Sequence, residues 1–335
     1  MRRLLAILAG LSLVVSACGG QNGVQSSSVP PMSSPTTVGF VAATYGAPWS
    51  AALAAGLSDG AKRFGGSVNF EIPTSPVPSD QVNYAEEQVV RHPSAVGVLA
   101  TDPTALCPTA EIARRAGVLF YAAGSDVACP GVGLFVEPAA PQAIGFAAVD
   151  NLAAEVHGTG DVAIVSAGAT EPDLQAWVHY MQIRLARYPR LHLVPVQTGA
   201  ITSSDNTAVA DRLMDAYPDL KGMIGAGPAN VAPLASAVEQ AGEKGKIAVT
   251  GVTDPNTARR WIEDGTVGAV VYYDVVHLGY LTYWAVKQAL NHRSFAASQH
   301  VPGLQGAVTW SAATHTLLLG PPVVITKANV NKLNY

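Results

Sequence analysis

The stretch from residue 38 to residue 72 reads VGFVAATYGAPWSAALAAGLSDGAKRFGGSVNFEI, and its pattern repeats along much of the chain. Short apolar runs at Val38 to Ala42 and Val68 to Ile72 flank a longer amphipathic segment from Trp49 to Phe64. Such an alternation predicts a strand, a helix and a second strand. Because parallel strands need a crossover connection of about this length, the stretch predicts one βαβ unit.

The same alternation continues beyond this unit. Further strands are expected at Ala95 to Ala100 and Val118 to Ala122, and a second series begins with strands at Val162 to Ser166 and Leu191 to Gln197. Phe135-Val136-Glu137-Pro138 lies between the series and indicates a crossing, and the apolar helix Val275 to Leu290 is expected to return to the first series. We therefore predict an α/β fold with two doubly wound, Rossmann-like lobes joined by a hinge of several crossings.

Length and composition agree with two lobes, since 335 residues of which 49% are hydrophobic exceed one domain of ordinary size. Residues rich in Gly, Ser, Gln and Pro precede the first strand and predict a flexible tether. The expected divisions are a leader at 1–18, the tether at 19–37, a first lobe at 38–137 plus about 275–318, and a second lobe at 138–274 plus about 319–335.

The leader has the pattern of a lipoprotein signal. Arg2 and Arg3 precede an apolar run from Leu4 to Val15, and small residues lead to Cys18, whose thiol would accept the lipid. A plain secretory peptide or an N-terminal membrane helix is the alternative, but the run is shorter than the roughly 20 residues that span a bilayer. We expect acyl chains to anchor the protein on the extracytoplasmic side of the cell membrane.

The charge balance argues against a nucleic-acid partner. The formal net charge is -4, and loss of Arg2 and Arg3 with the leader leaves 18 basic against 24 acidic residues, or -6. No block of Lys and Arg is present that would neutralise a row of phosphates.

Two cysteines remain beside Cys18. Cys107 and Cys129 are expected to form a disulfide, because such bonds persist outside the cytoplasm. Two separately buried thiols are the alternative, since the bond requires Cα atoms within about 7 Å. No CxxC pair or neighbouring metal-spaced histidine accompanies them.

No motif predicts a cofactor or catalysis. The turn Gly225-Ala226-Gly227-Pro228-Ala229-Asn230 is similar to a dinucleotide fingerprint, but Asn230 replaces the third glycine. The next strand, Ile247 to Gly251, also lacks an acidic ribose partner. Neither a GxSxG elbow, a P-loop nor a metal-spaced pair of histidines occurs, so we expect no cofactor, no metal and no enzymatic activity.

A set of polar and aromatic residues directly follows the predicted strands, where ligands of open α/β sheets bind. Carboxylates and amides bind ligand hydroxyls, and an indole packs on the C–H face of a sugar. Each residue could instead cap a helix or lie in a solvated loop. The candidate ligand-binding residues are Tyr45, Trp49, Asp102, Asp126, Asp173, Gln175, Trp177, Asn230 and Asp274.

A group of short motifs resembles those of the type-I periplasmic sugar-binding proteins, most closely the branch of rhamnose-binding and autoinducer-binding receptors of ABC importers. The resemblance covers essentially the whole mature chain. It implies the two-lobed fold, a bridge between Cys107 and Cys129, and ligand contacts from Asp173 and Asp274. The motifs are Thr101-Asp102-Pro103 with Leu106-Cys107-Pro108, Ser125-Asp126, Ala176-Trp177, Ala216-Tyr217-Pro218-Asp219-Leu220-Lys221-Gly222, Asp264-Gly265-Thr266-Val267, Tyr273-Asp274-Val275-Val276, Leu278-Gly279-Tyr280-Leu281 and Leu319-Gly320-Pro321-Pro322.

The chain departs from this pattern in three places. Ala43 stands where autoinducer receptors place a lysine, and Gly124 begins what is usually an Asp-Ser-Asp run. Leu174 stands where a glutamine is common. A ligand hydroxyl left without its buried partner costs about 1 to 3 kcal/mol, so the autoinducer itself is a poor candidate and a smaller or less oxygenated sugar or polyol is favoured.

The expected function is that of a lipid-anchored, monomeric solute-binding protein of a carbohydrate ABC importer. Its lobes would close on a sugar or polyol by hinge motion and then dock on a membrane permease. One alternative is a sensory or quorum-signal receptor that uses the same closure without import. An exported enzyme is the other alternative, and no catalytic constellation supports it.

Overall fold

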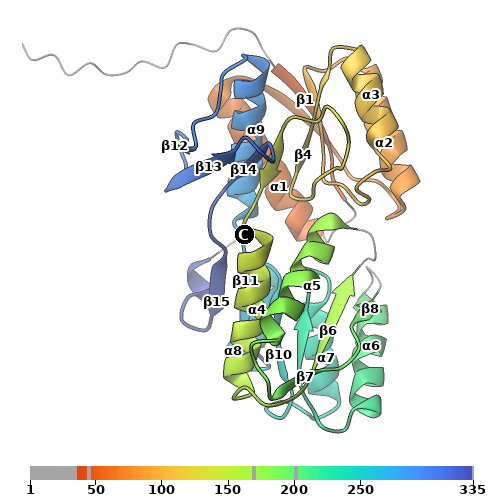
Figure 1. Cartoon of the computed structure of the whole chain (residues 1–335), viewed down its shortest axis with the longest axis vertical. Coiled ribbons are helices and arrows are strands. Elements are labelled where there is room, and N and C mark those ends of the chain that lie inside the picture. The colour runs from red at the N-terminus through yellow and green to blue at the C-terminus, as the bar shows by residue number, and fades with distance from the viewer. Residues whose placement is uncertain (1–35, 44–46, 168–170, 200–202, 334–335) are drawn as a thin grey trace, which may run out of the picture. The chain divides into compact units, whose positions relative to one another are not determined.

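The computed structural model describes residues 36–43, 47–167, 171–199 and 203–333 (Figure 1). The leader with Cys18, residues 19–35 of the expected tether and Tyr45 lie outside the described residues.

The first lobe is built on a sheet with the strand order β12-β13-β14-β5-β4-β3-β1-β2. Strands β1 to β5 are parallel to their neighbours, and β14 adds to β5 in parallel, whereas β13 is antiparallel to both β12 and β14. The strands are β1 (Thr36–Val41), β2 (Gly66–Glu71), β3 (Ala95–Val98), β4 (Leu119–Ala123), β5 (Phe135–Glu137), β12 (Ser298–His300), β13 (Ala307–Ser311) and β14 (Thr316–Leu318).

Alternating side chains of this sheet enter two different hydrophobic clusters. Val38 and Phe40 pack in the cluster with helices α1 (Ala47–Phe64) and α9 (Val275–Leu290), whereas Val41 packs with α2 (Pro78–Val90) and α3 (Cys107–Arg115). Because successive side chains of a strand point to opposite faces, the two helix pairs cover opposite faces of the sheet.

The second lobe has a sheet of order β15-β11-β10-β9-β6-β7, with β8 also paired to β6. Only β15 is antiparallel to its neighbour. The elements are β6 (Gly160–Ala167), β7 (Leu191–Leu193), β8 (Gln197–Gly199), β9 (Leu220–Gly225), β10 (Ala248–Val252), β11 (Val267–Tyr272), β15 (Val323–Thr326), α4 (Pro141–Glu155), α5 (Pro172–Leu185), α6 (Ser203–Ala216), α7 (Val231–Gln240), α8 (Pro255–Asp264) and the 3-10 helix η1 (Val330–Lys332).

The chain passes between the two sheets more than once. It leaves the first sheet after β5, returns after β11 into α9, and leaves again after β14 to reach β15 (Figure 1). Two α/β sheets linked in this way confirm the predicted fold class.

Close backbone contact holds α9 against α1. A side chain at Gly56 would place its Cβ 2.0 Å from the carbonyl oxygen of Val276, and one at Gly279 would lie 2.4 Å from that of Leu53. Only glycine permits so close an approach, and the returning helix is thereby fixed to the first lobe.

Several elements differ from the sequence expectation. One strand was expected from Leu191 to Gln197, but the structure has β7 and β8 with a break around Pro195, which has no N–H for a ladder. Strand β1 begins at Thr36, before the expected Val38, because Thr36 is buried and its carbonyl accepts a hydrogen bond from Tyr283 at 3.2 Å. Strands β12 to β15 were not expected.

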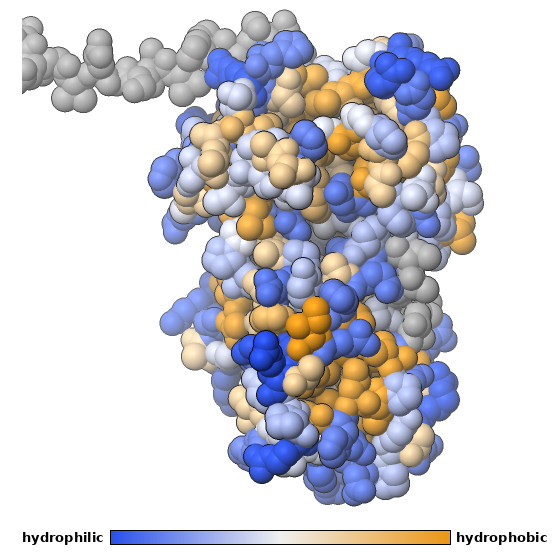
Figure 2. Space-filling view, viewed as in Figure 1, coloured by the Kyte–Doolittle hydropathy of each residue, from blue (hydrophilic) through white to orange (hydrophobic). Residues whose placement is uncertain are grey.

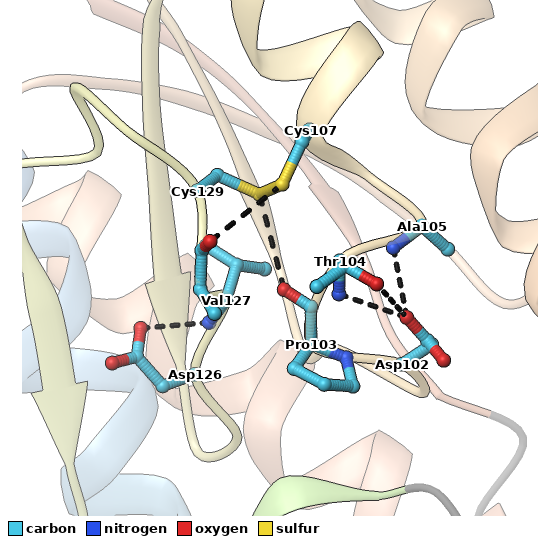
Figure 3. The surroundings of a disulfide bond; sticks show 9 residues. Asp102, Pro103, Thr104, Ala105, Cys107, Asp126, Val127 and Cys129 are labelled. Atoms are coloured by element: carbon cyan, nitrogen blue, oxygen red, sulfur yellow. Dashed lines mark hydrogen bonds between the residues drawn. A yellow bond between two sulfur atoms is a disulfide. The ribbon is translucent and has the colours of Figure 1, made fainter.

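The predicted disulfide is confirmed. Cys107 and Cys129 are bonded, with their Cα atoms 5.0 Å apart (Figure 3). The bond joins the start of α3 to the loop after β4, and this loop also carries Asp126. The covalent link therefore restrains a loop that contributes to the candidate site.

The face of the molecule in Figure 2 is mixed in polarity, with hydrophobic residues gathered over the region of α4 and α5. Of the large hydrophobic side chains of α5, Ile183 is 42% exposed. Within the described ranges, no helix is both long enough and apolar enough to cross a membrane.

Candidate functional site

The inner of two adjoining cavities lies where the lobes meet, and the outer one is lined by residues of the first sheet and its loops. The inner cavity has a volume of about 130 Å³, and the outer cavity has a volume of about 420 Å³. They share Asp126, Phe135 and Glu137. The remaining walls are Gly124, Pro138, Ala139, Pro141, Pro172, Asp173, Ala176 and Trp177 in the inner cavity, and Thr309, Trp310, Ser311, Thr314, Thr316 and Leu318 in the outer cavity.

A third cavity of about 330 Å³ lies elsewhere in the second lobe. Lys221, Lys246 and Gly268 line it, at the amino ends of β9, β10 and β11. Ligands of open α/β sheets bind at the carboxyl ends of the strands, and none of the predicted site residues lines this cavity, so we do not assign the site to it.

The wall shared by the inner and outer cavities holds two neighbouring carboxylates. Glu137 ends β5, and burial raises its pKa to about 7, with the charge of Asp126 adding to the rise. Burial also raises the pKa of Asp126, although its Oδ1 accepts a hydrogen bond from the N–H of Val127 at 2.8 Å (Figure 3). Both groups therefore hold a proton more tightly than exposed acids do.

The second lobe supplies a third carboxylate from the first turn of α5. Burial raises the pKa of Asp173 to about 7, and the N–H of Leu174 and the hydroxyl of Ser125 offset this only in part. Asp173 Oδ1 and Ser125 Oγ are both enclosed, and neither makes a hydrogen bond of normal geometry with the described residues. Hydrogen-bonding capacity of Asp173 therefore remains available at the inner cavity, beside the buried hydroxyl of Ser125.

Aromatic side chains pack beside these carboxylates. Trp177 lines the inner cavity, and the centroid of its ring lies 6.3 Å from that of Tyr273. Trp49 is 2% exposed, and its indole N–H lies beside the Tyr273 hydroxyl, whose pKa is raised by burial and by the charge of Asp173. The structure thus brings the predicted residues Trp49, Asp126, Asp173 and Trp177 to one junction.

Two other predicted carboxylates cap backbone instead. Asp102 Oδ1 accepts hydrogen bonds from Thr104 N and Ala105 N, both at 2.8 Å (Figure 3). Asp274 Oδ1 accepts from His277 N at 2.9 Å at the start of α9, and its Oδ2 lies 3.0 Å from His277 Nδ1. Neither residue lines the inner or the outer cavity.

The predicted amide residues also lie away from both cavities. Asn230 is buried in front of α7, and its side chain donates to Asn206 Oδ1 at 2.9 Å. Gln175 is exposed on α5.

Glu137, Ser125 and Tyr273 belong to the junction, but none was among the predicted site residues. Glu137 and Tyr273 each follow or end a strand, so the same strand-end rule could have selected them. Glu137 was instead interpreted only as part of a crossing. Within the described part of the chain, no group of His, Cys, Asp and Glu side chains is arranged to hold a metal ion.

Comparison with known proteins adds a family and a set of similar structures. The sequence profile of the periplasmic binding protein domain matches residues 38–294. An ABC transporter solute-binding protein from Clostridium phytofermentas with bound L-rhamnose aligns with a TM-score of 0.84 and 22% identity, over 90% of this chain and 98% of that one.

Two further structures align over most of their length. LsrB from Clostridium saccharobutylicum in complex with AI-2 has a TM-score of 0.82 and 18% identity, over 89% of this chain and 100% of that one. A sugar ABC transporter protein from Actinomyces odontolyticus has a TM-score of 0.73 and 25% identity, over 90% of this chain and 98% of that one.

Proposed function

Because this chain belongs to the periplasmic binding protein family, we propose that it is the lipid-anchored solute-binding protein of a carbohydrate ABC transporter. The observation that carries the proposal is the inner cavity, to which Asp126 of the first lobe and Asp173 of the second both contribute. Membership in a family of binding proteins agrees with the prediction that the chain is not an enzyme.

Closure of the two lobes would report that ligand is bound. Asp126 and Asp173 lie on different lobes, so a ligand contacts both only when the lobes are together. Such a ligand stabilises the closed form by its differential affinity for that form. We propose that the moving bodies are 38–137 with about 275–318 and 138–274 with about 319–335, and that the closed, monomeric protein delivers its ligand to a membrane permease.

A small sugar or polyol suits the inner cavity best. Carboxylates accept hydrogen bonds from hydroxyl groups, and the Trp177 indole offers an apolar wall. Leu174 is buried and supplies no amide, and Ala43 supplies no charge. These two positions favour a ligand with fewer oxygens than AI-2, whose complex with LsrB is among the similar structures.

Calorimetry with a panel of monosaccharides and polyols tests the site. We expect Asp173→Ala to weaken binding of the sugar that binds best by about tenfold or more, because a buried hydrogen bond to a charged group is lost. Asp219→Ala is the matched control, since Asp219 is exposed in a turn of the same lobe. Unchanged affinity in Asp173→Ala would remove this residue from the site.

The lipid anchor can be tested separately. Cys18→Ala should move the protein from the membrane fraction to the soluble extracytoplasmic fraction, because acylation of the thiol is lost. The full chain with Cys18 intact is the control. Retention of the variant in the membrane fraction would contradict the proposed anchor.

A signalling role is the second candidate, favoured by the similarity to the AI-2 complex of LsrB. In that case the same closure would report to a membrane receptor without import. Uptake of labelled ligand by cells with and without the gene distinguishes the two, since only an importer component changes the rate of uptake.

A further inference from the structure

The outer cavity lies on one face of the sheet formed by β5, β14 and β13. The strand register aligns Phe135, Thr316 and Ser311 in one row, and Glu137, Leu318 and Thr309 in the next. The alternate residues Val136 and Leu317 are fully buried, in the hydrophobic cluster that also contains α9. Successive side chains point to opposite faces, so Glu137 and Phe135 stand on the face away from this core and form a cavity wall.

The charge around this wall has a single sign. Asp126 and Glu137 line both cavities, Asp173 adds a third carboxylate to the inner one, and among the described residues no Lys, Arg or His lines either cavity. Residues 44–46 and 168–170, which lie outside the described ranges, have the sequences Thr-Tyr-Gly and Gly-Ala-Thr, which contain no basic residue. A buried carboxylate without a counter-charge is costly, and the raised pKa values of Glu137 and Asp173 express that cost.

Two further features at the same place suit a donor with a positive charge. The rings of Phe135 and Trp177 line the inner cavity, and aromatic faces attract cations. Ser125 is fully buried and faces Asp173, and its Oγ makes no hydrogen bond of normal geometry with the described residues. An ammonium group donates up to three hydrogen bonds, whereas these carboxylates and this hydroxyl all offer acceptors.

We propose that the ligand carries a cationic amine, as an amino sugar or an aminated polyol does, and that the amine binds between Asp126 and Glu137. The hydroxyl-bearing part of the ligand then lies in the inner cavity against Asp173 and Trp177. This assignment rests on the proposed function of solute binding and specifies the class of solute.

Matched pairs of ligands test the assignment by calorimetry on the full chain at pH 7. The probes are D-glucosamine and D-glucose, D-galactosamine and D-galactose, and glucamine and sorbitol, with the N-acetylated amines as charge-free controls. At least one amine should bind about tenfold or more tightly than its neutral partner, and acetylation should remove the gain.

Two variants test whether the amine binds between Asp126 and Glu137. Glu137→Gln and Asp126→Asn should each remove most of the preference for the amine, measured as the ratio of the affinities for the amine and for its neutral partner. Asp59→Asn removes the same charge from an exposed position on α1 and should leave the preference intact. Retained thermal unfolding transitions establish that the variants are folded.

The outcomes separate this inference from the function on which it rests. Neutral sugars that bind while their amines do not, or an amine preference that survives in both Glu137→Gln and Asp126→Asn, would overturn the cationic ligand and leave solute binding intact. Failure of every amine and every neutral compound to bind would count against both.

Discussion

Carboxylates at the strand ends of this protein fall into two regions with opposite properties. In the capping turns, Asp102 and Asp274 are supplied with hydrogen bonds. Hydrogen bonds from Thr104 lower the pKa of Asp102. Burial alone would raise the pKa of Asp274, but hydrogen bonds from His277 outweigh burial, so the pKa of Asp274 is lowered. In the cavity wall, burial raises the pKa of Asp126, Glu137 and Asp173.

The local sequence explains this difference. The residues that follow Asp102 and Asp274 supply N–H groups two or three positions later, so the chain itself satisfies those carboxylates. Glu137 is followed by Pro138, which has no N–H to offer. Strand-end position therefore brings a carboxylate near the ligand edge, but its unused accepting capacity is what makes it available to a ligand.

The largest expected effect is on stability, in the cavity wall. Glu137→Gln should raise the free energy of unfolding at pH 8 by about 2 kcal/mol, because an uncompensated buried charge is removed. The folded pKa of about 7 lies above the usual 4.5, so the stability that Glu137 contributes is present below about pH 4.5 and is lost as the pH rises to 7.

Urea unfolding of the wild type and of Glu137→Gln at pH 4 and pH 8 measures this change in the free energy of unfolding. The gain in stability should appear at pH 8 and be nearly absent at pH 4, where the carboxyl is protonated in both the folded and the unfolded state. Equal changes at the two pH values would show that packing, and not charge, distinguishes the cavity wall from the capping turns.

In the capping turns, removal of a carboxylate should lower the free energy of unfolding instead of raising it. Asp274→Ala should lower the free energy of unfolding by about 1 to 2 kcal/mol, because α9 loses its N-cap and His277 loses its partner. Asp274→Asn keeps a capping oxygen and is the control, with a smaller loss. A stabilised Asp274→Ala protein would place Asp274 with the cavity carboxylates and end the distinction.

Sequence patterns predicted the two-lobed fold because apolar periodicity reflects burial, which local spacing records. The helix Val275–Leu290, for example, was predicted with the bounds that the structure has. The strands after α9 were not predicted because few of their residues are buried. Val308 and Leu317 are two of these few buried residues. Strand-end logic selected Asp126, Asp173 and Trp177, which line the inner cavity. The hydrogen bonds that occupy Asp102 depend on turn geometry that the pattern of apolar residues does not contain.

A smaller effect is expected at Asp102. Asp102→Ala should lower the free energy of unfolding by about 0.5 to 1 kcal/mol, since a part-exposed turn loses hydrogen bonds that water replaces in part. Ligand affinity should stay within about twofold in calorimetry, in contrast to Asp173→Ala. If affinity instead falls by about tenfold, the free oxygen of Asp102 reaches the ligand and one residue serves both regions.

The smallest expected effect concerns His277. Its hydrogen bond with Asp274 raises the pKa of the imidazole above 6.5, so the stabilisation is present below pH 6.5 and is lost as the pH rises through the folded pKa. The side chain is 45% exposed, so solvent screening limits this contribution to a few tenths of a kcal/mol. Titration of His277 by NMR should show the raised pKa, and Asp274→Asn should return it toward 6.5.

An unchanged His277 pKa in Asp274→Asn would mean that the capping turn gains its stability from the backbone hydrogen bond alone. The N-cap hydrogen bond of Asp274 would then stabilise the turn independently of the ion pair between Asp274 and His277. Any stability lost between pH 6.5 and about pH 7 would in that case have to come from the carboxylates of the cavity wall, since the contribution of Glu137 is lost between about pH 4.5 and about pH 7.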